Sequence, residues 1–201
     1  MALGRRPGHE TSFDTAASIA EIQQLLRERA RNAPHGEFIT TIGGWSAEQL
    51  GENRLPTLAE LDAAAPDHPV LVVTNTAKRA ATNGLGRAFF QTRNVAINPN
   101  GEIAARVDIL RAVSILKNAM TFEQLKRNTQ YAMSWAAGLG LTNVMDMGSN
   151  VFTATDTDSI GAFSPSTGYD PLLALAKENK LKIRYRLNYI FSGIRPRSCL
   201  C

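Results

Sequence analysis

Hydrophobic residues are spaced in two different ways along this chain. From residue 18 to residue 32 they recur every three or four positions, which is typical of an amphipathic helix with one face in a core. Ser18 and Glu21 stand at its start with the spacing of a capping box, in which each side chain bonds the other residue's backbone N–H. Residues 70–74 form instead a continuous, mostly β-branched run, which predicts a buried strand.

Similar patterns predict further elements around this strand. A short β-type run at residues 38–42 ends in Gly43 and Gly44, which permit a sharp turn. A second capping box, at Thr57 and Glu60, opens a short helix. We also expect an alanine-rich helix over residues 77–90, broken near residues 84 and 86, and a hairpin with its tip at residues 98–101 and its arms at 95–97 and 102–105.

The second half of the chain has a regular order of elements. Helical periods predict helices at residues 108–120, 121–139 and 171–179, and apolar runs predict strands at residues 141–147 and 181–191. A polar segment at residues 148–168, rich in Thr, Ser and Asp, separates them. Because helix, strand, loop, helix and strand follow one another, a parallel sheet is favoured, and the loops after its strands are where such sheets place their chemistry.

Composition narrows the class of protein. The chain has 201 residues, 44% hydrophobic and 20% charged, which suits one globular domain or a large part of a bigger one. Its net charge of +4 is spread along the sequence, so nucleic-acid binding is not expected, and no apolar run reaches the ~18 residues of a membrane span. Its two cysteines, Cys199 and Cys201, exclude a disulfide framework, so we expect a reducing, cytoplasmic location.

One long string of residues resembles a known family. Residues 42–49 read Ile-Gly-Gly-Trp-Ser-Ala-Glu-Gln, and residues 54–70 read Arg-Leu-Pro-Thr-Leu-Ala-Glu-Leu-Asp-Ala-Ala-Ala-Pro-Asp-His-Pro-Val. This string is similar to one in the amidohydrolase type 3 family of the metal-dependent amidohydrolase superfamily. Weaker similarities follow in the family's order at residues 82–86, 137–146 and 181–187, so the resemblance covers about residues 5–193.

The resemblance implies an α/β fold, a partial TIM-like (β/α) barrel of the metal-dependent hydrolase type. We expect the barrel domain at residues 18–193 with an inserted α+β segment around 75–120, an N-terminal extension at 1–17 and a divergent tail at 194–201. Complete family members carry one or two divalent metals, often zinc, at the carboxyl ends of the barrel strands. The metal lowers the pKa of a bound water to ~7, and the resulting hydroxide attacks a carbon–nitrogen bond of a small-molecule amide.

The family's metal ligands have no counterpart in this sequence. The family carries a His-x-His pair at the end of its first strand, whereas the three histidines here, His9, His35 and His68, are far apart. The lysine, the later histidines and the aspartate of the family also have no counterpart. We therefore expect a truncated chain with no metal site and no cofactor of its own, which is inactive as a hydrolase.

A few residues remain as candidates for a pocket. Asp146 ends a predicted strand where barrel enzymes place functional side chains, and its alternative role is to cap a loop. Trp45 could line a substrate cleft or pack in the core. His68 is expected to order the turn before a strand, and Arg184 and Arg186 are expected on one face of theirs.

Two other interpretations stay open at this point. The chain could be a non-catalytic binding or interaction protein derived from a barrel remnant, which uses an exposed strand edge, also for self-association, or the loop at residues 148–168. It could also be a gene-model artefact, because residues 195–201 depart abruptly from the family pattern, as a missed splice or a frameshift would produce.

Overall fold

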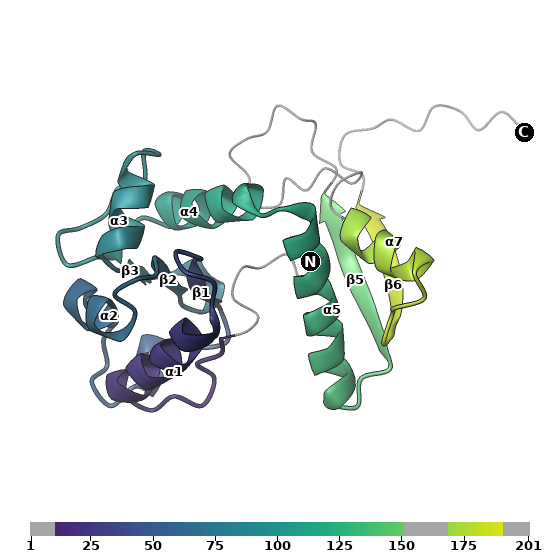
Figure 1. Cartoon of the computed structure of the whole chain (residues 1–201), viewed down its shortest axis with the longest axis horizontal. Helices are drawn as coiled ribbons and strands as arrows, with labels where there is room; N and C mark the ends of the chain where they lie inside the picture. The colour runs from purple at the N-terminus through teal and green to yellow at the C-terminus, as the bar shows by residue number, and fades with distance from the viewer. Residues whose placement is uncertain (1–10, 151–168, 191–201) are drawn as a thin grey trace, which may run out of the picture. The chain divides into compact units, whose positions relative to one another are not determined.

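The chain divides into two compact units, which we describe separately. The computed structural model describes residues 11–150 and 169–190. The N-terminal unit ends at Met120, and the C-terminal unit begins at Thr121. Figure 1 shows the order of the elements. The expected division at residues 17, 75–120 and 193 stays a prediction.

The N-terminal unit is built around a four-stranded mixed sheet of order β1-β2-β3-β4. β1 pairs with β2 in parallel, while β2 with β3 and β3 with β4 are antiparallel. Helix α2 makes the crossover between the two parallel strands. The elements are α1 (Ile19–Asn32), β1 (Ile39–Ile42), η1 (Ala47–Gln49), α2 (Leu58–Ala64), β2 (Val70–Val73), η2 (Asn75–Ala77), β3 (Ala80–Thr82), α3 (Gly84–Gln91), β4 (Glu102–Ile103) and α4 (Arg106–Ala119).

Strand β2 is the centre of this unit, and all four of its side chains are buried. Its even-numbered residues pack with α1 and α2 in one core cluster, and its odd-numbered residues pack with α3 and α4 in another. A strand covered on both faces needs a continuous apolar run, which is the pattern that the sequence shows here. Burying each such side chain fully stabilises the fold by about 1.5–3 kcal/mol.

The predicted helix over residues 77–90 is wrong in its first part. Residues Ala80–Thr82 form β3, which pairs with β2, and helix α3 begins only at Gly84. The helix starts there because the Asn83 side chain accepts a hydrogen bond from the Gly86 backbone N–H and caps it. The glycines therefore begin the helix, where the sequence pattern suggested that they break it.

The predicted hairpin is also only partly right. Its tip is a turn, in which the Gly101 N–H donates to the Asn98 carbonyl at 2.9 Å. Glu102–Ile103 forms β4, but this strand pairs with β3, so residues 95–97 are no arm of a hairpin. Non-local pairing took the place of the local pairing because β3 offers a buried edge.

The C-terminal unit is a smaller α/β arrangement. It comprises α5 (Phe122–Gly138), β5 (Asn143–Asn150), α7 (Asp170–Lys177) and β6 (Arg184–Ile190), and β5 pairs with β6 in parallel. Side chains of α5, α7 and the sheet share one core cluster, and the two helices contact each other. The first residues of the predicted polar loop, 148–150, belong to β5 instead. Its residues 151–168 lie outside the described part.

We predict that Gly86→Ala destabilises the N-terminal unit by about 1–3 kcal/mol. A Cβ at this position would lie 2.2 Å from Thr82 Oγ1 and 2.8 Å from the Val70 carbonyl oxygen, which belongs to the backbone of β2. Guanidinium unfolding followed by Trp45 fluorescence in a Trp135→Phe background measures this unit alone, because the chain has two tryptophans.

Gly51→Ala is the control in the same unit. Its Cβ would meet only the Ala17 carbonyl oxygen, at an ordinary 3.8 Å, so its unfolding free energy should stay within about 0.5 kcal/mol of the parent. Equal unfolding midpoints for both variants would contradict the close packing of α3 on β2.

Candidate functional site

The carboxyl ends of β1 and β2 form the candidate site of the N-terminal unit. Parallel strands place the loops that follow them at one edge of the sheet, where α/β proteins bind ligands. The two loops are joined directly, since the Gly44 N–H donates to Asn75 Oδ1 at 2.7 Å and the Asn75 N–H donates to the Trp45 carbonyl at 2.8 Å. The first loop is therefore held in place by the second.

Trp45 lies in the core beneath this edge. It is 1% exposed, its Nε1 donates to the Val73 carbonyl at 2.9 Å, and its ring meets Phe13 edge-on at 5.4 Å between centroids. The sequence left two roles open for Trp45, packing in the core and lining a substrate cleft. These contacts support the packing role. Trp45 as a pocket residue stays a prediction.

The loop after β2 is tight and polar. The Thr74 N–H and Oγ1 both donate to the Arg79 carbonyl, and the Arg79 N–H donates to Thr74 Oγ1. Ala77 adopts a left-handed φ of +50°, which is costly for a residue other than glycine. Arg79 forms an ion pair with Glu102 at 3.0 Å. The pKa of the exposed Glu48 carboxyl is lowered, first by hydrogen bonds from its own backbone and from Ser46, and then by the nearby cations.

The opposite side of the same edge carries a second carboxylate. Gly44 has a φ of +82°, and a Cβ there would lie 2.7 Å from Asp14 Oδ1, so the backbone passes close to Asp14. Ser12 Oγ donates to the same carboxylate. Thr11 Oγ1 is buried and has no hydrogen-bond partner, although Thr41 Oγ1 donates to the Thr11 carbonyl at 3.3 Å.

The described residues do not fit a metal centre of the kind that the resemblance implies. Within residues 11–150 and 169–190, no three His, Cys, Asp or Glu side chains come together in a way that could hold a metal ion. His68 is buried, and its Nδ1 lies 3.0 Å from the Glu37 carbonyl oxygen. A carbonyl oxygen can only accept, so Nδ1 is the hydrogen-bond donor of this pair. His35 is exposed, with its ring 6.3 Å from that of His68, and His9 lies outside the described residues.

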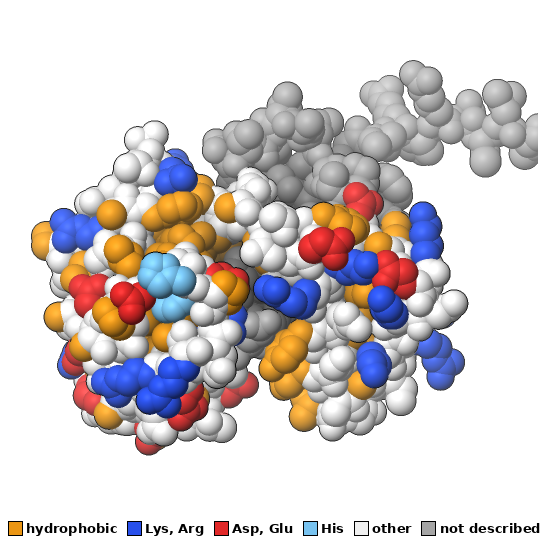
Figure 2. All heavy atoms as spheres, viewed as in Figure 1, with side chains coloured by type: hydrophobic (Ala, Val, Ile, Leu, Met, Phe, Trp, Pro, Cys, Tyr) orange, Lys and Arg blue, Asp and Glu red, His pale blue; other side chains and the backbone are white. Residues whose placement is uncertain are grey.

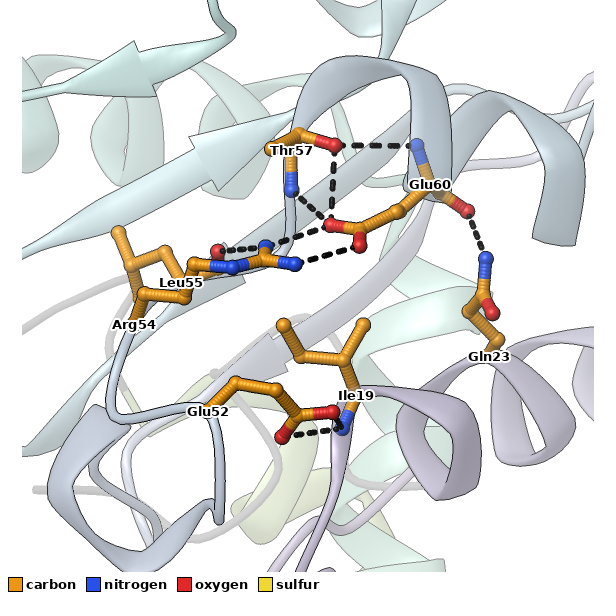
Figure 3. A network of polar contacts seen from close by, with 7 residues as sticks. All are labelled: Ile19, Gln23, Glu52, Arg54, Leu55, Thr57 and Glu60. Atoms are coloured by element: carbon orange, nitrogen blue, oxygen red, sulfur yellow. Dashed lines mark hydrogen bonds and ion pairs between the residues drawn. The ribbon is translucent and has the colours of Figure 1, made fainter.

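The polar residues of the Arg54–Val70 string act in holding the fold together. Arg54 donates two hydrogen bonds to the Glu60 carboxylate, at 2.7 and 2.8 Å, and Glu60 closes a capping box with Thr57 (Figure 3). The hydrogen bonds from Arg54 are the main reason why the pKa of Glu60 falls to about 2, and those from Thr57 add to them. The pair fixes the start of α2 against the preceding loop.

Neighbouring residues hold α1 in the same way. The carboxylate of Glu52 accepts from the Ile19 N–H with both oxygens at 3.2 Å, at the positive end of the α1 dipole (Figure 3). Gln49 Nε2 donates at 2.8 Å to the carbonyls of Phe13 and Ala16. Asp62 Oδ1 accepts from the Gly84 N–H at 2.8 Å.

Asn83 makes a central contact that the sequence analysis did not identify. Its side chain is fully buried, and Oδ1 accepts from the backbone N–H groups of Val70 and Gly86, at 2.9 and 3.0 Å. Its Nδ2 donates to the carbonyls of Ala65 and His68. A signal was present, because a polar amide between an apolar strand and a glycine-rich helix start is a cap position.

Asp146, the other candidate from the sequence, belongs to the C-terminal unit. Its backbone lies in β5 opposite Leu187, just before a register shift that ends at Ser149. A bulge of this kind can re-aim a side chain at a functional edge. The side chain of Asp146 is outside what the structure describes, so its role stays a prediction.

Comparisons with known proteins give a consistent family and fold. A model of the amidohydrolase family matches residues 10–189. No curated protein matches the sequence. Among solved structures, an uncharacterized metal-dependent hydrolase from Pyrococcus horikoshii is similar with a TM-score of 0.56 and 22% identity, over 89% of this chain and 32% of that one. One from Pyrococcus furiosus has a TM-score of 0.57 and 19% identity, over 87% and 32%.

These likenesses confirm the expected fold, an α/β arrangement that corresponds to part of a metal-dependent hydrolase barrel. The chain spans about a third of the length of both solved structures. Among the described helices, none is long and apolar enough to cross a membrane.

We predict that Glu60→Gln removes a pH-dependent part of the stability. The carboxyl has its usual pKa of 4.5 when unfolded and about 2 when folded, so its contribution is complete above pH 4.5 and is lost as the pH falls towards 2. Because Arg54 is 45% exposed, solvent screening keeps this contribution below about 1 kcal/mol. The difference in unfolding free energy between pH 7 and pH 3 should be smaller in the variant than in the parent.

Glu28→Gln is the control. Glu28 is exposed on α1, where its carboxylate accepts from Gln24 at 3.1 Å. Its substitution should leave the pH dependence unchanged, and an equal effect of both substitutions would argue against a special role of the Arg54–Glu60 pair.

Proposed function

The chain belongs to the amidohydrolase family, and from this premise we propose that its 201 residues form part of a metal-dependent hydrolase scaffold without carrying a catalytic centre of their own. The reaction of the family scaffold would be hydrolysis of a carbon–nitrogen bond other than a peptide bond, in a small-molecule amide. The observation that carries the proposal is the use of the motif's polar side chains in internal contacts of the fold.

Hydrolysis of this kind makes a definite demand on the side chains. A catalytic zinc needs about three protein ligands and an open position for water. In the described residues, three side chains of types that bind metals are engaged elsewhere: Glu60 with Arg54, Glu52 with the start of α1, and His68 with the Glu37 carbonyl. No catalytic step is therefore derived from these residues.

The family's sequence string can be present in this chain without the family's metal-dependent hydrolysis. The string at residues 42–70 supports the folding of the loops around β1 and β2, and this role needs no metal. We propose that zinc is the metal of complete family members, and that this chain works in a reducing compartment such as the cytoplasm. Support for the compartment comes from its only two cysteines, Cys199 and Cys201.

We predict that the purified chain shows no zinc-dependent hydrolysis of N-acyl amino acids and other small amides. Zinc added in excess and then dialysed away should leave well below one equivalent per chain, as measured by inductively coupled plasma mass spectrometry. One or more zinc ions retained per chain, together with hydrolysis that a chelator abolishes, would overturn the proposal.

A His35→Ala variant controls for adventitious zinc. His35 is exposed, so weak binding at the surface should fall in this variant without any change in hydrolysis. Zinc that is retained equally by the parent and this variant would point to ligands elsewhere in the chain.

A second candidate function is binding without catalysis. β1 and β4 lie at the two ends of the four-stranded sheet, and β5 has only β6 beside it in the part of the chain that is described. Unpaired strand edges are templates for further strands. The helix α5 also exposes an apolar stripe at Tyr131, Trp135 and Leu139, with Trp135 56% exposed, and Figure 2 shows an orange patch over this helix. Both features are typical of interaction surfaces.

We predict that the chain self-associates through these surfaces in a concentration-dependent way. Size-exclusion chromatography with light scattering should give a mass that rises from that of one chain, 21.9 kDa, as the concentration increases. A monomer across the whole concentration range would count against association through the edges.

A further inference from the structure

Three basic side chains lie at alternate positions of one short segment. Lys182, Arg184 and Arg186 are exposed, whereas Ile183 and Tyr185 between them pack with α7 in the core of the C-terminal unit. Alternate residues of a strand point to opposite faces of its sheet. Arg184 and Arg186 of β6 therefore lie on the face of the β5–β6 sheet that α5 and α7 do not cover, and Lys182 lies in the bend just before this strand.

This face holds no compensating charge in the described part of the unit. Arg184 lies beside Asn143 and Arg186 beside Met145, and both of these neighbours are uncharged. The ion pairs of the described residues use other cations of the unit: Glu178 pairs with Lys126 and with Lys180 at 2.9 Å. Lys182, Arg184 and Arg186 take part in none of them.

The neighbouring edge can accept another strand. β6 is paired with β5 along one side, and in the described residues no strand is paired along its other side. Parallel sheets are ordinarily covered on both faces and contain more than two strands. An added strand would use the N–H and C=O groups that β6 turns away from β5.

We propose that β6 binds an extended acidic segment of a partner polypeptide, with carboxylates at every second residue facing Arg184 and Arg186, and with Lys182 just before the strand adding to the positive charge. This deepens the second candidate function by naming a partner, and it is independent of self-association. Residues two apart in a strand are about 6.6–6.8 Å apart, so an adjacent strand with the same period sets one carboxylate beside Arg184 and the next beside Arg186. Charge and backbone pairing then favour the same register.

Two other occupants fit the face less well. Single-stranded nucleic acid is ordinarily held by aromatic rings as well as cations, and the only ring between these cations, Tyr185, lies on the covered side. A second copy of this chain would have to supply the acidic strand itself. The described strands β1 to β6 contain none with carboxylates at alternate positions.

The test uses the full chain and a fluorescein-labelled peptide, Thr-Glu-Val-Glu-Val-Glu-Thr. We expect its fluorescence anisotropy to rise with protein concentration and the affinity to fall as salt is added. The triple variant Lys182→Glu, Arg184→Glu and Arg186→Glu should bind the peptide at least about tenfold more weakly than the parent does. The triple variant Arg27→Glu, Arg31→Glu and Arg106→Glu is the control, because it changes the net charge equally at exposed positions of the N-terminal unit and should bind as the parent does.

Two control peptides separate pattern from charge. A peptide of the same composition with its three glutamates in a row, Thr-Val-Glu-Glu-Glu-Val-Thr, should bind more weakly. The alternating peptide with methylated backbone amides keeps its charge but cannot donate hydrogen bonds to β6, and it should not bind. Equal binding of all three peptides would overturn the proposal in favour of unspecific charge attraction.

The remaining outcomes are also decisive. Tighter binding of single-stranded DNA, lost in the same triple variant, would assign the face to nucleic acid and overturn the proposal. A dimer that the triple variant abolishes and the peptide cannot displace would assign it to a second copy. Circular dichroism checks the fold, and a Lys182→Gln, Arg184→Gln and Arg186→Gln variant repeats the measurement without introducing new negative charges.

Discussion

The buried amide of Asn83 is the contact on which the N-terminal unit depends. Its four hydrogen bonds join the turn after α2, the first residue of β2 and the first turn of α3. An unsatisfied amide in such a place would cost about 1–3 kcal/mol, so all of its groups must be paired at once. The absence of a side chain at Gly86 allows the helix to approach the strand closely enough for this pairing.

The residues of the family-like string therefore serve the folding of the scaffold, and this role does not depend on catalytic chemistry. Arg54, Thr57 and Glu60 cap α2, Gln49 and Glu52 hold the start of α1, and Asp62 receives the start of α3. Each side chain satisfies backbone groups that a loop or a helix end leaves open. Such residues are needed wherever the scaffold folds, whether or not a metal is bound near it. This explains how a chain can match the amidohydrolase family over residues 10–189 while its described residues hold no cluster of metal ligands.

The C-terminal unit follows a different constraint. A parallel pair of strands needs cover on both faces, and within the described residues α5 and α7 supply it on one face. Lys126 and Lys180 share Glu178 beside the helices, whereas Arg184 and Arg186 lie on the other face of the sheet. Figure 2 shows both acidic and basic side chains on each unit in its view.

The sequence by itself determined the elements that depend on local chemistry. The capping box at Thr57 and the apolar run of β2 appear where the patterns predicted them, because caps and burial act over a few residues. The long family string likewise gave the fold class. Tertiary structure alone decided that residues 80–82 are a strand, that β4 pairs with β3, and that Asn83 and Glu52 hold distant segments together. The pairing of β3 with β2 joins residues 7 to 11 positions apart, that of β4 with β3 joins residues 21 to 23 apart, and Glu52 reaches Ile19 over 33 residues. No local pattern encodes such partners.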